Sequence, residues 1–327
     1  MKFATCLHAG AEKSGVVSGR TVHFLDGTMR ELIDAGLRHA LDLADEALQH
    51  DGTDLSDVQL RAPLQPSTMR DFVAFEEHVE GVRRSVDGQE GVVDAWYEAP
   101  RFYFTNPYTV TGPDEVIRPP ALCQALDFEL EVAAVIGKAG SNVTVEAASD
   151  HIFGYTILND WSARDIQRRE MQVSLGPSKG KDFANTLGPW IVTADEFENR
   201  RDADGFIDIE CTVDVNGARI GRDSLANMGW TFEALVAYAS RDSYVHTGDV
   251  LGSGTIGNGG CLAELWGRSG EQSPPPLHSG DVVTMTVEGI GTLSNVVGQS
   301  TPAPPVPAAR RSDHSAIRNA RRIPSPN

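Results

Sequence analysis

The stretch Leu126–Gly137, LDFELEVAAVIG, alternates apolar and acidic residues before it becomes wholly apolar. In a strand, the apolar residues would share one face and the three acids, Asp127, Glu129 and Glu131, would share the other. Like charges on one face repel one another, and a buried carboxylate without a partner costs free energy. The pattern therefore predicts a strand whose acidic face meets a cation or open water.

A hard divalent cation suits Glu129 and Glu131, which lie two residues apart and would point the same way. An exposed strand face with ordinary charges explains the same two residues equally well. The pair alone leaves both interpretations open.

The composition of the 327-residue chain indicates a large, acidic protein. Hydrophobic residues make up 40% of it, which suits one large domain or two unequal ones. The formal net charge of -18 argues against broad binding to nucleic acid or to an anionic membrane. We find no apolar run of membrane-spanning length, no signal peptide and no CxxC pair among the four cysteines. We therefore expect a cytoplasmic protein with reduced thiols.

Residues 1–65 are predicted to form a small N-terminal domain, with short strands followed by an amphipathic helix over residues 28–51. Residues 66–299 form the predicted catalytic domain, which begins with a helix over residues 69–84 and continues mainly as β-like segments. Because strands and helices do not alternate regularly, this pattern argues against a doubly wound parallel sheet. The tail, residues 300–327, is rich in Pro, Ala and Arg and is predicted to be disordered.

A second group of polar residues follows the apolar segment that ends at Asp160. If a helical turn begins there, Asp160, Arg164 and Gln167 share a face and bring an acid, a guanidinium and an amide together. An N-cap aspartate followed by surface residues is the simpler interpretation of this group alone. Lys181 lies in an irregular, glycine-flanked segment, where it would balance charge or donate to an oxyanion only if it were buried near carboxylates.

On the predicted helix of residues 69–84, Asp71 and His78 are seven residues apart and so lie near one stripe. Histidine suits proton transfer near neutral pH, although a single His on an amphipathic helix is more often a half-exposed residue without a role. Glu264 falls in the strand-like segment LAELWG, where a buried carboxylate would need a partner such as His78. Cys261 is interpreted as a packed thiol.

The glycines at 252, 254 and 257 spell GxGxxG, the pattern of dinucleotide-binding loops. That motif should open a helix within a strand–helix–strand unit and be followed by an acid about 20 residues later, whereas here NGG and the strand-like segment LAELWG follow the glycines. We interpret these glycines as positions of tight turns and close backbone approach.

Taken together, these motifs resemble the fumarylacetoacetate hydrolase family over about residues 63–298. The resemblance rests on NDWSARDIQ at residues 159–167, followed at family spacing by LGP, Lys181 and PW, and on LDFELE, GTIG and GDVVTMTVEGIGTLSN in the family's order. Several ordered motifs are far more specific than any single one. The resemblance implies an α+β fold, a mixed β-roll of layered sheets behind a smaller N-terminal domain, and a homodimer.

By residue-to-residue matching, the resemblance implies a divalent metal held by Glu129, Glu131 and Asp160. Asp71 matches a fourth carboxylate of the fumarylacetoacetase branch. Asp127 matches no ligand, so we expect it at the edge of the strand, either paired or solvated. The expected ion is Mg²⁺, with Mn²⁺ or Ca²⁺ as alternatives.

The resemblance also assigns the remaining candidate residues. His78 matches the general base and Glu264 matches the carboxylate that orients it. The residues matched to the metal's surroundings and to substrate contacts are Lys181, Arg164, Gln167, Tyr103 and Thr255.

The implied activity is hydrolysis of a C–C bond in a 1,3-diketone or an acylpyruvate-like acid. The metal would act as a Lewis acid that holds the leaving carbanion as an enolate, and His78 would activate water. Oxo-acid decarboxylases and keto–enol isomerases share the family's metal site, and a non-catalytic relative that binds a small acid is a third alternative. Val73 and Met171 stand where fumarylacetoacetase has tyrosines, and Ala184 and Asn185 stand where it has Gly and Thr, which argues for a different substrate.

Overall fold

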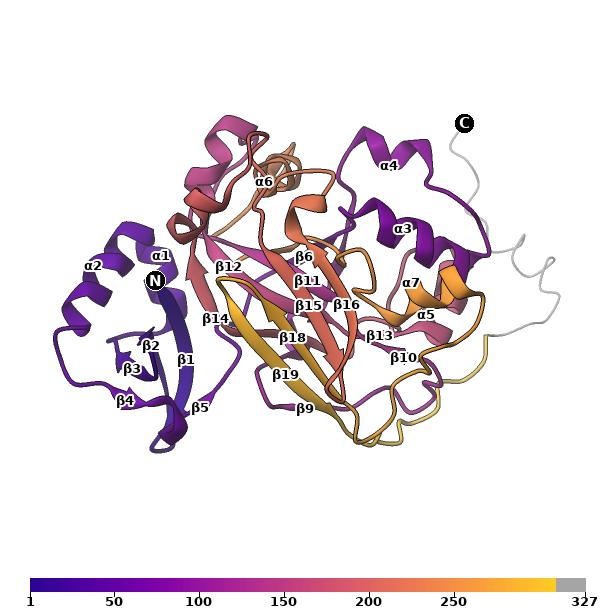
Figure 1. Ribbon diagram of the computed structural model, residues 1–327, viewed down its shortest axis with the longest axis horizontal. Coiled ribbons are helices and arrows are strands. Elements are labelled where there is room, and N and C mark those ends of the chain that lie inside the picture. The colour runs from indigo at the N-terminus through magenta and orange to yellow at the C-terminus, as the bar shows by residue number, and fades with distance from the viewer. Residues whose placement is uncertain (310–327) are drawn as a thin grey trace, which may run out of the picture.

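Twelve strands form the larger sheet of the computed structural model, which describes residues 1–309 (Figure 1). Ten of them follow the order β4-β3-β2-β1-β14-β12-β11-β17-β6-β7, while β5 pairs with β1 and β8 with β14. The bounds are β1 (Lys2–His8), β2 (Ala11–Ser18), β3 (Thr21–Phe24), β4 (Thr53–Asp54), β5 (Gln59–Leu60), β6 (Met69–Phe72), β7 (Phe102–Thr105), β8 (Val110–Thr111), β11 (Leu130–Ile136), β12 (Ile152–Asp160), β14 (Asn185–Thr193) and β17 (Val250–Gly252). Because β1 pairs with β14, the N-terminal module continues the sheet of the catalytic region.

A second sheet of five strands has the order β16-β15-β18-β19-β9. Its strands are β9 (Val116–Ile117), β15 (Glu210–Val215), β16 (Ala218–Ser224), β18 (Val282–Val287) and β19 (Gly291–Val297). Alternate residues of β18 are buried, which is the pattern of a strand with one face on the core. Two short strands, β10 (Leu126–Asp127) and β13 (Ser162–Ala163), pair separately.

The helices lie around these sheets (Figure 1). They are α1 (Met29–Ala35), α2 (Leu37–Ala47), α3 (Glu76–Val82), α4 (Asp94–Glu98), α5 (Arg164–Met171), α6 (Phe232–Ser240) and α7 (Leu262–Ser269). A π-helical turn, residues 83–87, extends α3. The helix predicted over residues 28–51 is two helices, because Gly36 adopts φ 91° between them.

The helix predicted over residues 69–84 is wrong in its first half. Residues Met69–Phe72 form β6, which pairs in parallel with β17 and antiparallel with β7. All four side chains of β6 are buried. Pairing with β17 and β7 therefore decides the conformation of this segment, although its local pattern also fits a helix. Asp71 therefore lies on a strand and His78 on α3, and they do not share a helical stripe.

The strand predicted for LAELWG is also wrong. These residues form α7, whose N-cap Cys261 accepts a hydrogen bond from the backbone N–H of Glu264 at 3.4 Å. Gly270 ends the helix in the left-handed conformation that favours glycine. The segment is apolar on most sides because it is packed against α3 and the residues that follow α3.

The opening stretch LDFELEVAAVIG is not one continuous strand. It divides into β10 and β11, with a break at residues 128 and 129. Every residue of β11 is buried, because β11 lies between β12 and β17 within the larger sheet. The predicted α+β fold of layered sheets is confirmed.

The C-terminal tail lies mostly beyond the described residues. The disorder predicted for residues 300–327 falls largely on residues 310–327, outside the described part of the chain, and residues 300–309 contain no helix or strand. Across residues 1–309, none of the helices combines the length and hydrophobicity needed to cross a bilayer.

Candidate active site

Four buried carboxylates converge where several strands of the larger sheet meet. Each contributes one oxygen to a group in which all ligand atoms lie within 4.8 Å of one another. The four residues are Asp71, Glu129, Glu131 and Asp160. They come from β6, from the residue just before β11, from β11 itself and from the end of β12. Antiparallel pairing places Glu129 beside Asp160, whose backbone N–H donates to the carbonyl of Glu129.

A glycine makes this close approach possible. Gly252 lies opposite Asp71 in the register of β17 and β6. A Cβ atom at this position would lie 2.7 Å from Oε2 of Glu131 and 2.8 Å from Oδ1 of Asp71. The space that a side chain would take is thus filled by two carboxylates, which explains the first glycine of the GxGxxG pattern.

Two buried cations neutralise part of the negative charge. Lys181 forms ion pairs with Glu129 and Asp160. Arg164, at the first turn of α5, contacts Oε1 of Glu129 at 2.6 Å and donates to Gln167 at 3.1 Å. Although burial raises it, the pKa of Glu129 lies well below its usual range because Arg164 and Lys181 are so close.

The other three carboxylates remain short of positive charge. Burial, followed by the neighbouring carboxylates, raises the pKa of Glu131 well above its usual range. Burial also raises the pKa of Asp160 and of Asp71, and Lys181 offsets only part of this effect. One oxygen of Asp71 and one of Asp160 are buried without a hydrogen-bond partner.

These observations fit a hard divalent cation. Mg²⁺, Mn²⁺ and Ca²⁺ prefer oxygen ligands, and carboxylates supply both the oxygens and the charge. A cation among Asp71, Glu129, Glu131 and Asp160 would give the two unpartnered oxygens a partner. It would also offset the effects of burial and of carboxylate repulsion, which together raise the pKa values of Asp71, Glu131 and Asp160.

Asp127 has a different role from its neighbours, and of the two alternatives expected for it, a paired or a solvated side chain, the structure shows the paired one. It is fully buried and accepts from Nε of Arg164 at 2.8 Å. It also accepts from the backbone N–H groups of Leu262 and Ala263, at the start of α7. Asp127 thus links the guanidinium to a helix N-terminus, where a carboxylate is favoured. Asp127 does not belong to the group of four carboxylates.

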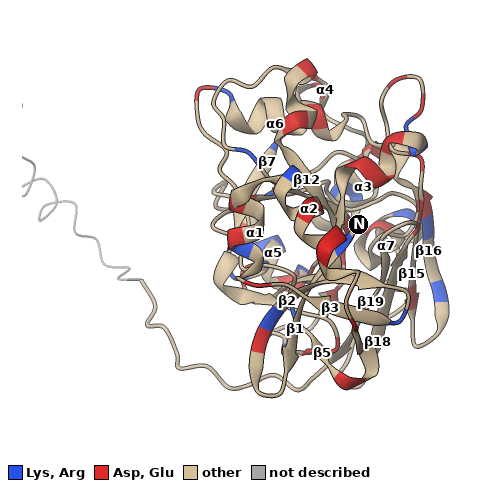
Figure 2. Cartoon of the chain, turned by 90° about the vertical axis from the view of Figure 1, so that its left-hand side faces the viewer, with Lys and Arg blue, Asp and Glu red and all other residues tan. Residues whose placement is uncertain are grey.

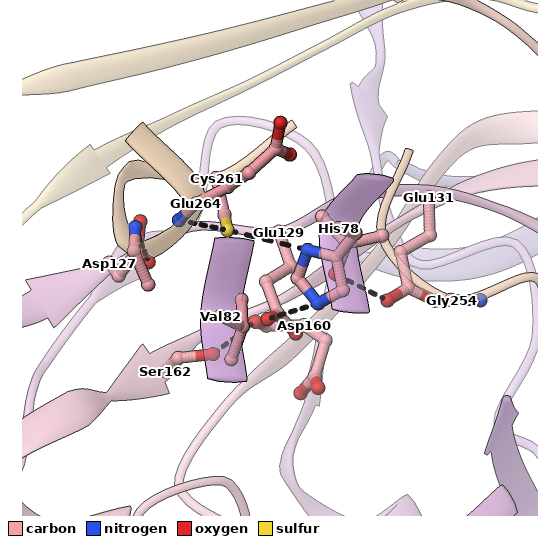
Figure 3. A network of polar contacts seen from close by, with 12 residues as sticks. His78, Val82, Asp127, Glu129, Glu131, Asp160, Ser162, Gly254, Cys261 and Glu264 are labelled. Atoms are coloured by element: carbon pink, nitrogen blue, oxygen red, sulfur yellow. Dashed lines mark hydrogen bonds and ion pairs between the residues drawn. The ribbon is translucent and has the colours of Figure 1, made fainter. Parts of the chain in front are cut away.

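His78 lies beside the carboxylates, on the buried side of α3 (Figure 3). Its Nε2 is 3.8 Å from Oε1 of Glu129, and its Nδ1 is 3.6 Å from Sγ of Cys261. Burial lowers the pKa of His78 to about 4, so the imidazole is neutral near pH 7. The ring is therefore held between a carboxylate and a thiol.

Glu264 does not pair with His78, contrary to the predicted dyad. Its carboxylate points away from the imidazole in Figure 3. Oε1 contacts Arg268 at 2.7 Å and accepts from the backbone N–H of Gly259 at 3.3 Å. The helical geometry of α7 causes this difference: Cys261 caps the helix and faces His78, whereas Glu264 lies on its first turn. Sequence reasoning treated Cys261 as a packed thiol, and its position three residues before Glu264 becomes informative only once α7 is known to be a helix.

A cavity of about 240 Å³ joins these groups. The predicted site residues that line it are Asp71, His78, Tyr103, Glu129, Glu131, Arg164, Gln167, Lys181 and Thr255. Tyr103, on β7, donates to Asp160, and Thr255 contacts Glu131 at 3.4 Å. Val73 and Met171 also line the cavity. The cavity therefore gathers the candidate residues except Asp160, which adjoins it through Tyr103 and Lys181, and Glu264, which lies elsewhere.

Comparison with known protein families, curated proteins and solved structures gives relatives of one kind. The chain matches the family described as fumarylacetoacetate (FAA) hydrolase C-terminal over residues 67–298. It is 30% identical over 245 residues to the oxaloacetate tautomerase YisK of Bacillus subtilis, covering 75% of this chain and 74% of that protein. It is 31% identical over 311 residues to a fumarylacetoacetase of Arabidopsis thaliana, covering 77% and 73%.

Among solved structures, a fumarylacetoacetate hydrolase from Exiguobacterium antarcticum superposes with a TM-score of 0.72 at 27% identity. The match covers 91% of this chain and 99% of that one. The family match spans most of the chain, from just before β6 to the end of the second sheet, and includes every residue of the carboxylate group. The chain belongs to the fumarylacetoacetate hydrolase family.

Proposed function

We propose that this chain is a divalent-metal-dependent hydrolase that cleaves a C–C bond in a 1,3-diketone or an acylpyruvate-like acid. One observation carries the proposal: four buried carboxylates converge beside a buried histidine, and three of the four line one cavity with it. The carboxylates suit a cation, and a histidine adjacent to them suits the activation of water.

The carboxylates of Asp71, Glu129, Glu131 and Asp160 would hold the cation. When bound, it would supply a Lewis acid for the oxygens of a β-dicarbonyl group. Lys181 holds Glu129 and Asp160 in place through its two ion pairs. These contacts fix the carboxylates before any substrate arrives.

His78 takes a proton from water in the proposed reaction. If the ring donates Nδ1–H to Cys261, then Nε2 carries the lone pair and faces the side of Glu129. Gln167 accepts from Arg164 through its Oε1, which leaves the amide nitrogen to donate to an oxyanion of the substrate. The base and the donor thus both line the cavity.

A keto–enol tautomerase is the second candidate, favoured by the similarity to an oxaloacetate tautomerase. Tautomerisation moves a proton and needs no attacking water. The missing contact between His78 and Glu264 also favours it, because water activation is strongest when a carboxylate orients the base.

The deciding experiment is a panel of acylpyruvates, β-diketones and oxaloacetate, assayed with Mg²⁺ and with Mn²⁺ and resolved by product mass. Hydrolysis of the C–C bond gives two products whose masses sum to that of the substrate plus water, decarboxylation removes the mass of CO₂, and tautomerisation changes no mass. Two such products from an acylpyruvate or a β-diketone support the proposal. Turnover without any change in mass would favour a tautomerase. Turnover in which the only change is the loss of CO₂ would favour a decarboxylase.

Two variants test the base. His78→Ala should lose hydrolysis by about 10²-fold or more while it keeps its affinity for Mg²⁺. His39→Ala removes an exposed histidine on α2 and should leave the rate unchanged. Hydrolysis by His78→Ala at the wild-type rate would remove His78 from the mechanism.

A further inference from the structure

A second cavity of about 300 Å³ adjoins the candidate active site. It lies between α3, the residues after β6 and the start of α4. The two cavities share Val73, His78, Val82 and Arg101 in their walls. The carboxylates line only the first cavity, so His78 stands at the boundary between a charged compartment and this second one. Figure 3 shows His78 and Val82 one turn apart on α3.

The walls of the second cavity are mainly apolar. Besides the shared residues, they include Val79, Val93, Ala95 and Trp96. Trp96 is held rigidly: its Nε1 donates to the carbonyl of Val73 at 2.6 Å, and its ring packs edge-on against Trp230 at 4.6 Å. A firm, preformed apolar wall favours an apolar ligand.

The two arginines of this cavity contribute their aliphatic stems. The guanidinium of Arg83 donates to the carbonyl of Glu90 at 3.2 Å. That of Arg101 donates to Tyr238 at 3.1 Å and pairs with Glu98 at 3.4 Å. Because both cations already bind protein acceptors, a charged group in the cavity would have to compete for them.

We propose that the second cavity binds the acyl substituent of the substrate and that this substituent is apolar. The proposal rests on the proposed hydrolase function. In that reaction, the carbonyl carbon that water attacks must lie next to His78, and the oxo-acid end must lie toward the carboxylates. The group on the other side of the attacked carbon then points past His78 into the apolar cavity. An acylpyruvate with an aromatic or branched acyl group has this shape.

The chemical step balances with water alone. The oxygen of water bonds to the acyl carbon, and the bond from this carbon to the central methylene breaks. The electron pair of that bond stays on the methylene carbon, which takes up a proton and becomes the methyl group of pyruvate. The acyl group leaves as a carboxylic acid, which loses the second proton of water to solvent.

The test uses the full chain with Mg²⁺ and three acylpyruvates, whose acyl groups are acetyl, benzoyl and succinyl. We expect kcat/KM to be about tenfold or more higher for the benzoyl substrate than for the acetyl one, because a phenyl group gains contact area in the second cavity. The succinyl substrate, which ends in a carboxylate, should not exceed the acetyl substrate.

A matched pair of variants locates the effect. Val93 is 48% exposed and lines the cavity, and Val145 is 46% exposed but lies outside it, so an aspartate at either position has access to solvent. Val93→Asp should lower kcat/KM for the benzoyl substrate about tenfold and change that for the acetyl substrate less than twofold. Val145→Asp should change neither.

The outcomes separate the two proposals. If the acetyl substrate is hydrolysed but the benzoyl substrate is not preferred, or if Val93→Asp affects both substrates equally, the apolar cavity has no such role and the hydrolase function stands. Preference for the succinyl substrate would overturn the apolar assignment in the same way. If none of the three is hydrolysed, the assignment of the acyl substituent is wrong, and the hydrolase function falls with it only if the β-diketones of the wider panel are not hydrolysed either.

Discussion

At the scale of single residues, the absence of a side chain at Gly252 determines how closely two carboxylates approach each other. Its backbone φ is not in the left-handed region, so glycine is not required there for conformation. It is required for space, because a Cβ would touch Glu131 and Asp71 at 2.7 and 2.8 Å. The residue thus acts on the carboxylate group without contributing any ligand.

Gly252→Ala should therefore separate the carboxylates and weaken metal binding. We expect affinity for Mn²⁺ to fall about 10- to 100-fold, the range for changes to residues that support metal ligands. Titration calorimetry with Mn²⁺ measures the affinity, and circular dichroism of the metal-free protein checks the fold. Wild-type affinity in a folded variant would mean that the cation does not bind between Glu131 and Asp71.

Cys261 is the second residue with an unexpected position. Cys261→Ala removes the sulfur that faces Nδ1 of His78, so we expect kcat for hydrolysis to fall about tenfold while KM and Mg²⁺ affinity stay unchanged. Loss of the N-cap should also cost about 1 kcal/mol of stability. Cys261→Ser keeps a side-chain acceptor and should recover part of kcat.

Cys211→Ala is the matched control, since Cys211 is buried in β15 of the other sheet. It should lose stability without a selective loss of kcat. If Cys261→Ala kept the full kcat, the thiol would have no part in positioning His78.

The sequence identified candidate site residues where several motifs occurred in the family's order. Motif order predicted the convergence of Glu129, Glu131 and Asp160 and the presence of Lys181 beside them, whereas alternation alone left the two glutamates equally compatible with a solvated face. The burial of Asp127 was not predictable, because it depends on the N-terminus of a helix that begins 135 residues later.

At the scale of elements, the packing of α3 against α7 positions His78. The two helices cross at glycines. A Cβ at Gly267 would overlap the carbonyl oxygen of Gly81, and one at Gly81 would press into the backbone of Glu264. The close crossing brings Cys261, at the start of α7, into contact with His78 on α3.

Gly267→Ala should force the two helices apart. We expect a loss of about 1–3 kcal/mol in the free energy of unfolding, as for overpacked interiors, together with a fall in kcat. Urea denaturation measures the stability, and Ser269→Ala, an exposed change at the end of the same helix, is the control. Unchanged stability in Gly267→Ala would contradict the close crossing.

Glu264, on the first turn of α7, should make stability depend on pH. Burial raises its pKa to about 7 in the folded protein, although Arg268 opposes the effect. A carboxyl group with a raised folded pKa binds its proton more tightly in the folded state, so its contribution to stability falls as pH rises from about 4.5 to about 7. Thermal unfolding from pH 5 to 8 should show wild type losing stability relative to Glu264→Gln over this range.

The exposed Glu271 offers the control for that comparison, because Glu271→Gln should leave the pH profile of wild type unchanged. A Glu264→Gln profile parallel to that of wild type would mean that Glu264 titrates as an ordinary surface glutamate.

Local patterns failed at two elements for the same physical reason. The run Met69–Phe72 and the segment LAELWG are both almost wholly buried, and a buried run carries no periodicity that separates a strand from a helix. Tertiary neighbours decide between them: β17 and β7 flank the first, and α3 packs against the second.

At the scale of the whole molecule, negative charge is widespread outside the cavity as well as within it. In Figure 2, Lys and Arg are scattered among more numerous Asp and Glu and form no continuous stripe in that view. The whole charge distribution therefore favours cations over anions near the site. A substrate that carries a carboxylate depends correspondingly on the local positive charge of a bound metal, Lys181 and Arg164.

The layered fold was predictable from the order of motifs along the chain. The sequence did not predict that the N-terminal strands and the catalytic region share one sheet. The join between β1 and β14 unites residues 1–65 with the catalytic region in one sheet, and no local signal in either strand identifies its partner. Long-range pairing of this kind is set by which edges remain to be covered once the other strands have paired.

The central claim is that the carboxylate group binds a divalent cation on which catalysis depends. The most direct test is the rate of acetylpyruvate hydrolysis by chelator-treated protein before and after Mg²⁺ is added back, for wild type and for Glu131→Gln. The account predicts no turnover by either protein without metal, full recovery by wild type with Mg²⁺, and little recovery by the variant. Equal turnover by wild type with and without metal would contradict it.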